Sequence, residues 1–206
     1  MLFYHASPTG QIDVLRPAVS GHGTPLVYLS AKPENCLVYL SNAVERFCRA
    51  QGIALEGRLR TWASYGFSPE GKLILEEYYP YALRETYAGV GGYLYAVADA
   101  PQAAPLPDIP FAFGSPQAVR VTGSTPVPDA LAALLAAEKR GKIKIRRFCT
   151  QSAEKRRWIA QTVRAELHAY GEETQYAAFL LAKFPFLRTA EENPGRQARK
   201  DEEAFS

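Results

Sequence analysis

The sequence predicts an α+β protein, because its pattern changes along the chain. Up to about residue 125, short runs of apolar and aromatic residues alternate with turns rich in Gly and Pro, as in small antiparallel or mixed sheets. From Pro126 onward, apolar residues recur at spacings of three and four, which is typical of helices. We expect an α/β core over 1–125, a helical and basic part over 126–187, and a loose, charge-rich tail over 188–206.

The first elements follow from local sequence. LFYHAS (2–7) and TPLVYLS (24–30) are rich in residues that favour strands, and a loop containing Gly and Pro separates them. Pro33 suits the first turn of a helix, and apolar residues then recur at helical spacing toward Gly52. The sequence therefore predicts two neighbouring strands of one sheet, with a single helix of about four turns packed behind them.

The remaining elements are assigned in the same way. The expected strands are TWASYGFS (61–68), GKLILEEYY (71–79), GGYLYAVAD (91–99), QAVRVTG (117–123) and KIKIRRF (142–148). The expected helices are a short one over Tyr81–Tyr87, one from Asp129 to Gly141, a long one capped by Thr150 or Ser152, and one over Glu172–Lys183.

Composition narrows the classes of protein. The chain has 206 residues, of which 47% are hydrophobic and 22% charged, so it reads as an ordinary globular protein with one sizeable core. No apolar stretch is long enough to cross a membrane and the N-terminus lacks the signal-peptide pattern, so we expect a cytoplasmic protein. Cys36, Cys48 and Cys149 have no CxxC spacing, which argues against a disulfide framework and against a zinc site.

The common catalytic motifs are missing from the sequence. It contains no phosphate loop, dinucleotide fingerprint, zinc-protease helix or serine-hydrolase elbow. What remains is a YHAS strand, a loop with Gly and Pro, and a VYLS strand that feeds directly into a helix. This order resembles the start of the ADP-ribosyltransferase fold, in particular bacterial members with histidine on the first strand and tyrosine on the second. The resemblance covers residues 1–50 and, more loosely, 90–122.

The resemblance implies that NAD is the substrate and that His5 and Tyr28 bind it. His5 would hydrogen-bond ribose and the nicotinamide end, and Tyr28 would stack on the nicotinamide ring. Tyr39 and His22 are further candidates for binding NAD, and the alternative for His22, which stands between two glycines, is a residue of the loop. An imidazole can donate and accept hydrogen bonds at once, and a phenol ring offers a flat face to a flat ligand. The alternative for His5 is a histidine satisfied within the core, and for Tyr28 it is packing within the sheet.

A catalytic carboxylate is harder to assign. The resemblance implies an acid at the start of a late strand, where FAFGSPQAVRV offers Gln117 instead. An amide can bind a ribose hydroxyl but does not stabilise the positive charge that develops when the nicotinamide bond breaks. Glu77, with its neighbour Glu76, could supply the carboxylate from LILEEYY.

A basic segment offers a different partner. Residues 138–206 carry fifteen Lys or Arg against ten Asp or Glu, which leaves the first 137 residues with a charge of −2. The density peaks over 139–157, where Lys142, Lys144, Arg146 and Arg147 could bind the phosphates of nucleic acid, although charged edge strands commonly look the same. Three hypotheses stay open: an ADP-ribosyltransferase-like enzyme, an inactive nucleotide-binding module of the same fold, and a nucleic-acid-associated protein.

Overall fold

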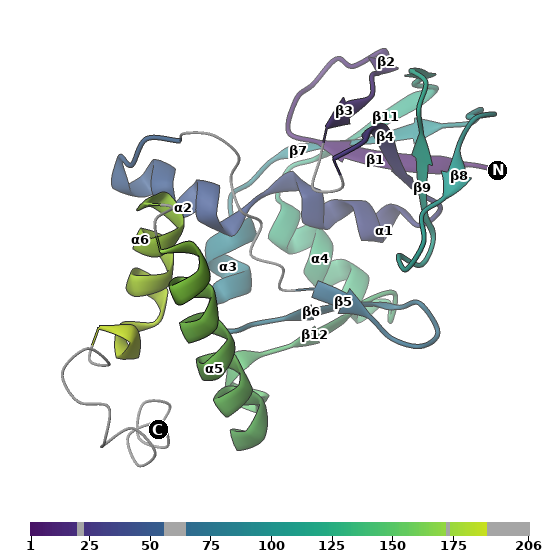
Figure 1. Ribbon diagram of the computed structural model, residues 1–206. Coiled ribbons are helices and arrows are strands. Elements are labelled where there is room, and N and C mark those ends of the chain that lie inside the picture. Colours follow the sequence, from purple (N-terminus) through teal and green to yellow (C-terminus); the bar gives the residue numbers. More distant parts are fainter. Residues whose placement is uncertain (20–22, 56–64, 172–173, 189–206) are drawn as a thin grey trace. The chain divides into compact units, whose positions relative to one another are not determined.

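A computed structural model of the chain describes residues 1–19, 23–55, 65–171 and 174–188. The α+β class is confirmed, with short strands in small sheets and helices concentrated toward the C-terminus (Figure 1). The chain divides into two compact units: a sheet unit of residues 1–41, 65–75 and 87–145, and a helical unit of residues 42–64, 76–86 and 146–206. This division differs from the expected boundary at 125/126, because the two units interleave along the sequence.

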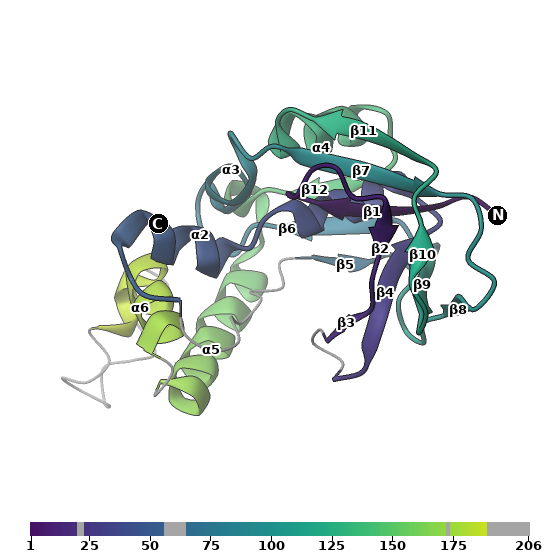
Figure 2. The same ribbon diagram turned by 90° about the horizontal axis from the view of Figure 1, so that it is seen from above.

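The sheet unit is built on one antiparallel sheet. Its strands follow the order β11-β7-β1-β4-β9-β8, and β3 also pairs with β4 (Figures 1 and 2). The bounds are β1 Phe3–Ser7, β3 Ala18–Val19, β4 Pro25–Ser30, β7 Gly92–Val97, β8 Ala104–Pro105, β9 Ala112–Ser115 and β11 Gly123–Val127. The expectation that the first two long strands are neighbours is confirmed, since Tyr4 of β1 pairs with Ser30 of β4.

Each face of this sheet is covered. On one face, Phe3, Val27, Leu29 and Val97 form a buried cluster with Leu15 of β2 (Val14–Leu15) and Val119 of β10 (Val119–Arg120), which pair with each other. The other face meets η1 (Leu37–Leu40), because a side chain at Gly92 of β7 would come within 2.5 Å of Leu40 Cδ2. Glycine at position 92 therefore permits η1 to approach the sheet.

The single helix expected from Pro33 to Gly52 is wrong. The structure has α1 (Pro33–Cys36), then η1, then an extended residue, Ser41, and a new helix α2 (Ala43–Gln51). The Asn42 side chain accepts hydrogen bonds from the backbone N–H groups of Val44 and Glu45, so it caps α2. The break coincides with the passage from the sheet unit to the helical unit. Within the sheet unit, α1 packs against β1 and β4, and η1 packs against β1.

The sheet unit also contains α4 (Ala130–Lys139), which begins where expected. Asp129 accepts a hydrogen bond of 2.7 Å from Ala132 N and a second, of 2.6 Å, from Gly89 N, so one carboxylate caps the helix and holds the preceding loop. After α4, β12 (Lys144–Arg146) joins β6 (Leu73–Glu76) and β5 (Tyr65–Phe67) in a three-stranded sheet. The strands β6 and β12 lead from the sheet unit into the helical unit.

The helical unit has its own core. It contains α2, most of α3 (Ala82–Tyr87), η2 (Phe148–Thr150), α5 (Ala153–Tyr170), α6 (Thr174–Lys183) and η3 (Pro185–Leu187). Ser152 caps α5 as one of the two expected residues, since its Oγ accepts from Lys155 N. The most deeply buried side chains are Val44, Cys48, Val163, Phe179 and Leu180, each with no exposed surface. This core explains the apolar spacing of the C-terminal sequence.

Candidate functional site

His5 is held by the main chain of Tyr28. His5 lies in β1, between β7 and β4, and its Nδ1 is 2.9 Å from the carbonyl oxygen of Tyr28. Because a carbonyl oxygen only accepts, Nδ1 must carry the proton and donate. In the neutral ring, Nε2 is then an acceptor. No contact to Nε2 is recorded among the residues that the structure describes.

The protonation state of His5 follows from its surroundings. Burial of the ring lowers its pKa below the ordinary value, and the hydrogen bond to the Tyr28 carbonyl opposes part of this effect. A ring whose pKa lies below about 6.5 is mostly neutral at pH 7. His5 therefore presents an unprotonated Nε2 at neutral pH.

The hydrogen bond between the His5 ring and the Tyr28 carbonyl lies just beyond the last backbone pair of β1 and β4. Tyr4 and Ser30 form the recorded pair of this ladder, and beyond it the His5 ring binds the Tyr28 carbonyl that faces β1. Counting back two residues from Ser30 puts the Tyr28 side chain on the face of the sheet shared by Tyr4 and Ser30. His5 instead shares its face with Tyr95, its partner on β7. The two rings leave the sheet on opposite faces, and the direct link between them is the main chain.

The neighbours of His5 on β7 fix the end of β1. Tyr95 is 1% exposed, and its hydroxyl donates a hydrogen bond of 2.6 Å to the carbonyl of Thr9. The rings of Tyr93 and Tyr95 lie 6.1 Å apart. A Cβ at Gly10 would come 2.9 Å from the Tyr93 ring, so the loop after β1 passes directly over that ring. These tyrosines position the strand that carries His5.

Two other predicted NAD contacts have different outcomes. Tyr39 lies in η1 of the sheet unit, is 54% exposed, and meets Tyr65 edge-on with ring centroids 6.2 Å apart. It is an accessible aromatic side chain in the same unit as His5 and Tyr28. His22 lies outside the described residues.

Gln117 is anchored through its backbone. It follows β9, the strand that pairs with β4 and places Gly114 opposite Tyr28. Its N–H donates to Ser115 Oγ at 3.2 Å, and that hydroxyl donates to the Gln117 carbonyl at 2.9 Å. The residue itself is exposed. The structure thus fixes the turn at Gln117 and leaves its amide side chain at the surface.

Glu77 belongs to the helical unit, and both of its carboxylate oxygens are engaged. Oε1 accepts a hydrogen bond of 3.1 Å from the backbone N–H of Leu83, and Oε2 accepts one of 3.1 Å from Phe148 N. The N–H of Glu77 donates to the Arg146 carbonyl at 2.9 Å. Glu77 therefore ties α3 and η2 to the end of β6, which is a structural role.

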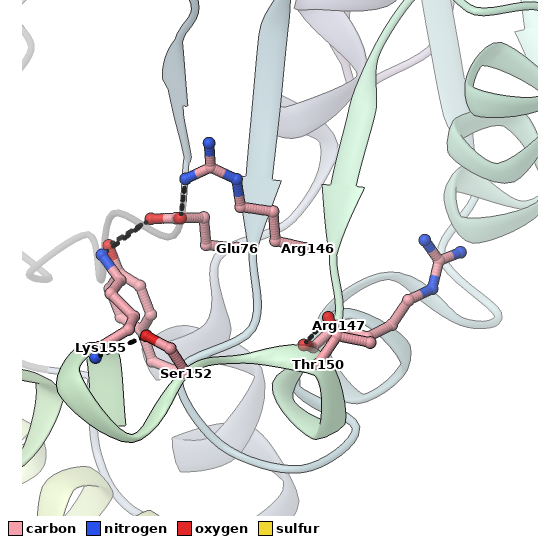
Figure 3. A network of polar contacts seen from close by, with 7 residues as sticks. Glu76, Arg146, Arg147, Thr150, Ser152 and Lys155 are labelled. Carbon is pink, nitrogen blue, oxygen red and sulfur yellow. Dashed lines mark hydrogen bonds and ion pairs between the residues drawn. The ribbon is translucent and has the colours of Figure 1, made fainter. Parts of the chain in front are cut away.

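Glu76 is the centre of an ion-pair network in the helical unit (Figure 3). Its oxygens lie 2.7 Å from Arg146 Nη1 and 3.2 Å from Lys155 Nζ. Burial opposes ionisation of Glu76, but the hydrogen bonds and positive charges of Arg146 and Lys155 outweigh it, so the pKa is lowered. Lys155 also lies 3.9 Å from the centre of the Trp158 ring. Arg146, expected to bind nucleic acid, is thus partly neutralised within the protein.

A carboxylate that was not predicted as a site residue, Asp108, lies in the loop before β9. Asp108 and Phe111 both have positive φ angles, 64° and 61°, which is strained for residues other than glycine. The carbonyl of Phe111 accepts a hydrogen bond of 2.9 Å from Ala31 N, and Lys32 Nζ lies 3.5 Å from the centre of the Phe111 ring. The Asp108 loop is therefore fastened to the residues that directly follow β4. In the sequence, Asp108 belongs to the turn PDIP (107–110), directly before FAFGSPQAVRV.

The two compact units divide the basic segment into two groups, since Arg146 and Arg147 belong to the helical unit and the residues up to 145 to the sheet unit. Lys139, Arg140, Lys142 and Lys144 surround the α4–β12 turn of the sheet unit and are exposed. No ion pair is recorded for these four within the described part of the chain. Ile143 and Ile145 are buried between them, which confirms the expected alternation on β12.

Two kinds of feature are absent from the residues that the structure describes. Among these residues, no group of three or more His, Cys, Asp or Glu side chains could hold a metal ion, and no helix is long and apolar enough to cross a membrane. Cys36, Cys48 and Cys149 are free thiols.

Comparison of the chain with protein-family models, curated proteins and solved structures finds no match.

Proposed function

We propose that the sheet unit binds NAD, with His5 as the residue that recognises a ribose hydroxyl. The observation that carries this proposal is the hydrogen bond from His5 Nδ1 to the Tyr28 carbonyl, because it leaves Nε2 as an acceptor. A sugar hydroxyl is a donor that suits a neutral imidazole nitrogen. The proposal joins this geometry to the resemblance of the YHAS and VYLS strands to ADP-ribosyltransferases.

Aromatic side chains support a flat ligand. Tyr28 is half-buried on β4, and Tyr39 is exposed on η1 in the same unit. Phenol rings bind flat heterocycles through their faces and lose little conformational freedom in doing so. Because the Tyr28 ring leaves the face of the sheet opposite to the His5 ring, one NAD molecule reaches both only where the pairing of β1 with β4 ends, beyond Tyr4 and Ser30. We assign Tyr28 and Tyr39 to the nicotinamide end of NAD, and His5 to a ribose on the other side of this point.

Transfer of ADP-ribose needs a carboxylate in addition to binding. Glu77 is a poor choice, because backbone N–H groups occupy both of its oxygens. Asp108 is a better one, since its loop is fastened beside the end of β4 and stores backbone strain of a kind that gathers at active sites. We propose that transfer to an acceptor, where it occurs, depends on Asp108, and that without this carboxylate the unit binds NAD only.

The test uses a substitution that separates the two nitrogens of His5. His5→Asn keeps a donor that can reach the Tyr28 carbonyl but removes the acceptor at Nε2. Calorimetric titration with NAD should show binding to the native chain and at least about tenfold weaker binding to His5→Asn, equivalent to one hydrogen bond. His168→Asn, at an exposed histidine of α5, is the matched control. Equal affinities, or no heat from the native chain at millimolar NAD, would refute the proposal.

A second candidate function is nucleic-acid binding at the α4–β12 turn. The observation that favours it is the group of exposed cations without recorded ion pairs, Lys139, Arg140, Lys142 and Lys144. Binding of a single-stranded RNA, followed by anisotropy, should weaken steeply with salt, and Lys142→Glu with Lys144→Glu should lower the salt slope by about two. Lys72→Glu, at an exposed lysine of the same unit, is the control. Identical slopes in all three proteins would exclude this function.

A further inference from the structure

Asn35 is a buried polar side chain whose amide is unsatisfied by the residues that the structure describes. It lies in α1 and is 6% exposed. Neither its Oδ1 nor its Nδ2 has a hydrogen-bond partner in the described part of the chain. A buried amide without partners is strongly destabilising, so such groups usually signal a missing water, ion or ligand.

The place of Asn35 in the fold relates it to Tyr28. Two residues separate the end of β4 from the start of α1, and α1 packs against both β1 and β4. Since η1 continues from α1 and covers the face of Gly92, this layer lies on the face that Tyr4, Ser30 and Tyr28 share. Lys32 N donates to Ser30 Oγ at 3.0 Å, which fixes the short connection. Asn35 is therefore buried in the layer that covers the Tyr28 side of the sheet.

We infer that Asn35 recognises the carboxamide of the nicotinamide ring. This inference rests on the proposed function. An asparagine side chain and a carboxamide are complementary, because each offers one carbonyl acceptor and one NH₂ donor. Pairing the two would satisfy both unpartnered atoms of Asn35 at once. It would also select NAD over the analogue in which a carboxylate replaces the carboxamide, since Oδ1 would then face an acceptor.

The test compares ligands as well as variants. Asn35→Leu keeps the branched shape of the side chain, with a larger volume, and removes both polar atoms. Because a buried amide without partners is costly, the melting temperature should stay equal or rise. NAD affinity should fall by about tenfold to a hundredfold, corresponding to two hydrogen bonds, and the preference for NAD over its carboxylate analogue should disappear. ADP-ribose lacks the nicotinamide ring, so its affinity should be the same for the native chain and for Asn35→Leu.

The outcomes separate this inference from the proposed function. If the native chain binds neither NAD nor ADP-ribose, the proposed function fails and this inference fails with it. If both bind and Asn35→Leu binds NAD as tightly as the native chain does, Asn35 holds only a buried water and this inference alone is overturned. Should Asn35→Leu fail to fold, Asn35→Ala gives the same comparison, because a loss specific to NAD and absent for ADP-ribose still supports the inference and equal losses refute it.

Discussion

Replacing Glu77 tests whether its carboxylate supports the fold or performs chemistry. The structure shows two hydrogen bonds from backbone N–H groups to this carboxylate, each 3.1 Å long. Hydrogen bonds to a charged group contribute roughly 1.5–3 kcal/mol each. Glu77→Gln retains one acceptor and places an NH₂ group against the other N–H, so we expect a loss of about 2 kcal/mol. Glu77→Ala removes both acceptors and should lose about 4 kcal/mol.

These losses are large enough to measure. In a protein of this size, 1 kcal/mol corresponds to about 2–4 °C in melting temperature, so Glu77→Ala should melt about 8–16 °C below the native chain. Thermal and urea unfolding followed by circular dichroism provide the assay. Glu154→Gln, at an exposed glutamate of α5, is the control and should melt with the native chain. If Glu77→Gln were as stable as the native chain but lost NAD cleavage, the structural role assigned to Glu77 would be wrong.

Three further predictions concern the network, a helix boundary and the site. Glu76→Gln should be destabilised by about 1–2 kcal/mol at pH 7. Because the pKa of Glu76 is lowered in the folded chain, the difference in unfolding free energy between this variant and the native chain should disappear when unfolding is measured below about pH 4. A difference that persists there would contradict the ion-pair account. Asn42→Ala should destabilise the chain by about 1 kcal/mol in urea unfolding, and no change would show that α2 does not need its cap. In an assay of nicotinamide release from NAD, Asp108→Asn should abolish any turnover of the native chain. Gln117→Glu should not increase turnover, because the proposal assigns the carboxylate to Asp108; a gain would place the catalytic position at Gln117.

Local signals predicted many of the elements. The strands β1 and β4, the caps at Asp129 and Ser152, and the alternation on β12 all depend on residues within a few positions of one another. The break before α2 also had a local signal, since Asn42 is followed three residues later by Glu45, the spacing of a helix cap. The continuous apolar spacing on both sides of the break concealed it.

Long-range pairing limited the rest of the prediction. β9 has the sequence AFGS, which lacks β-branched residues, and it forms a strand because β4 pairs along its whole length. The role of Glu77 depends on Phe148, which is 71 residues away in the sequence. The interleaving of the two units likewise depends on contacts between distant segments. Only part of the candidate site could therefore be predicted from the sequence. The strands of His5 and Tyr28 could be placed side by side, but the opposite faces of the two rings, the tautomer of His5 and the Asp108 loop could not.

The most direct test of the central claim is the tautomer of His5 and its response to NAD. The chain has three histidines, so nitrogen NMR of the imidazole rings gives few signals, and His5→Asn identifies the one from His5. We predict a neutral ring at pH 7 with the proton on Nδ1, and a change at Nε2 on addition of NAD, because that nitrogen accepts a hydrogen bond from the ligand. A ring protonated on Nε2, or an Nε2 signal that does not move with millimolar NAD, would contradict the account.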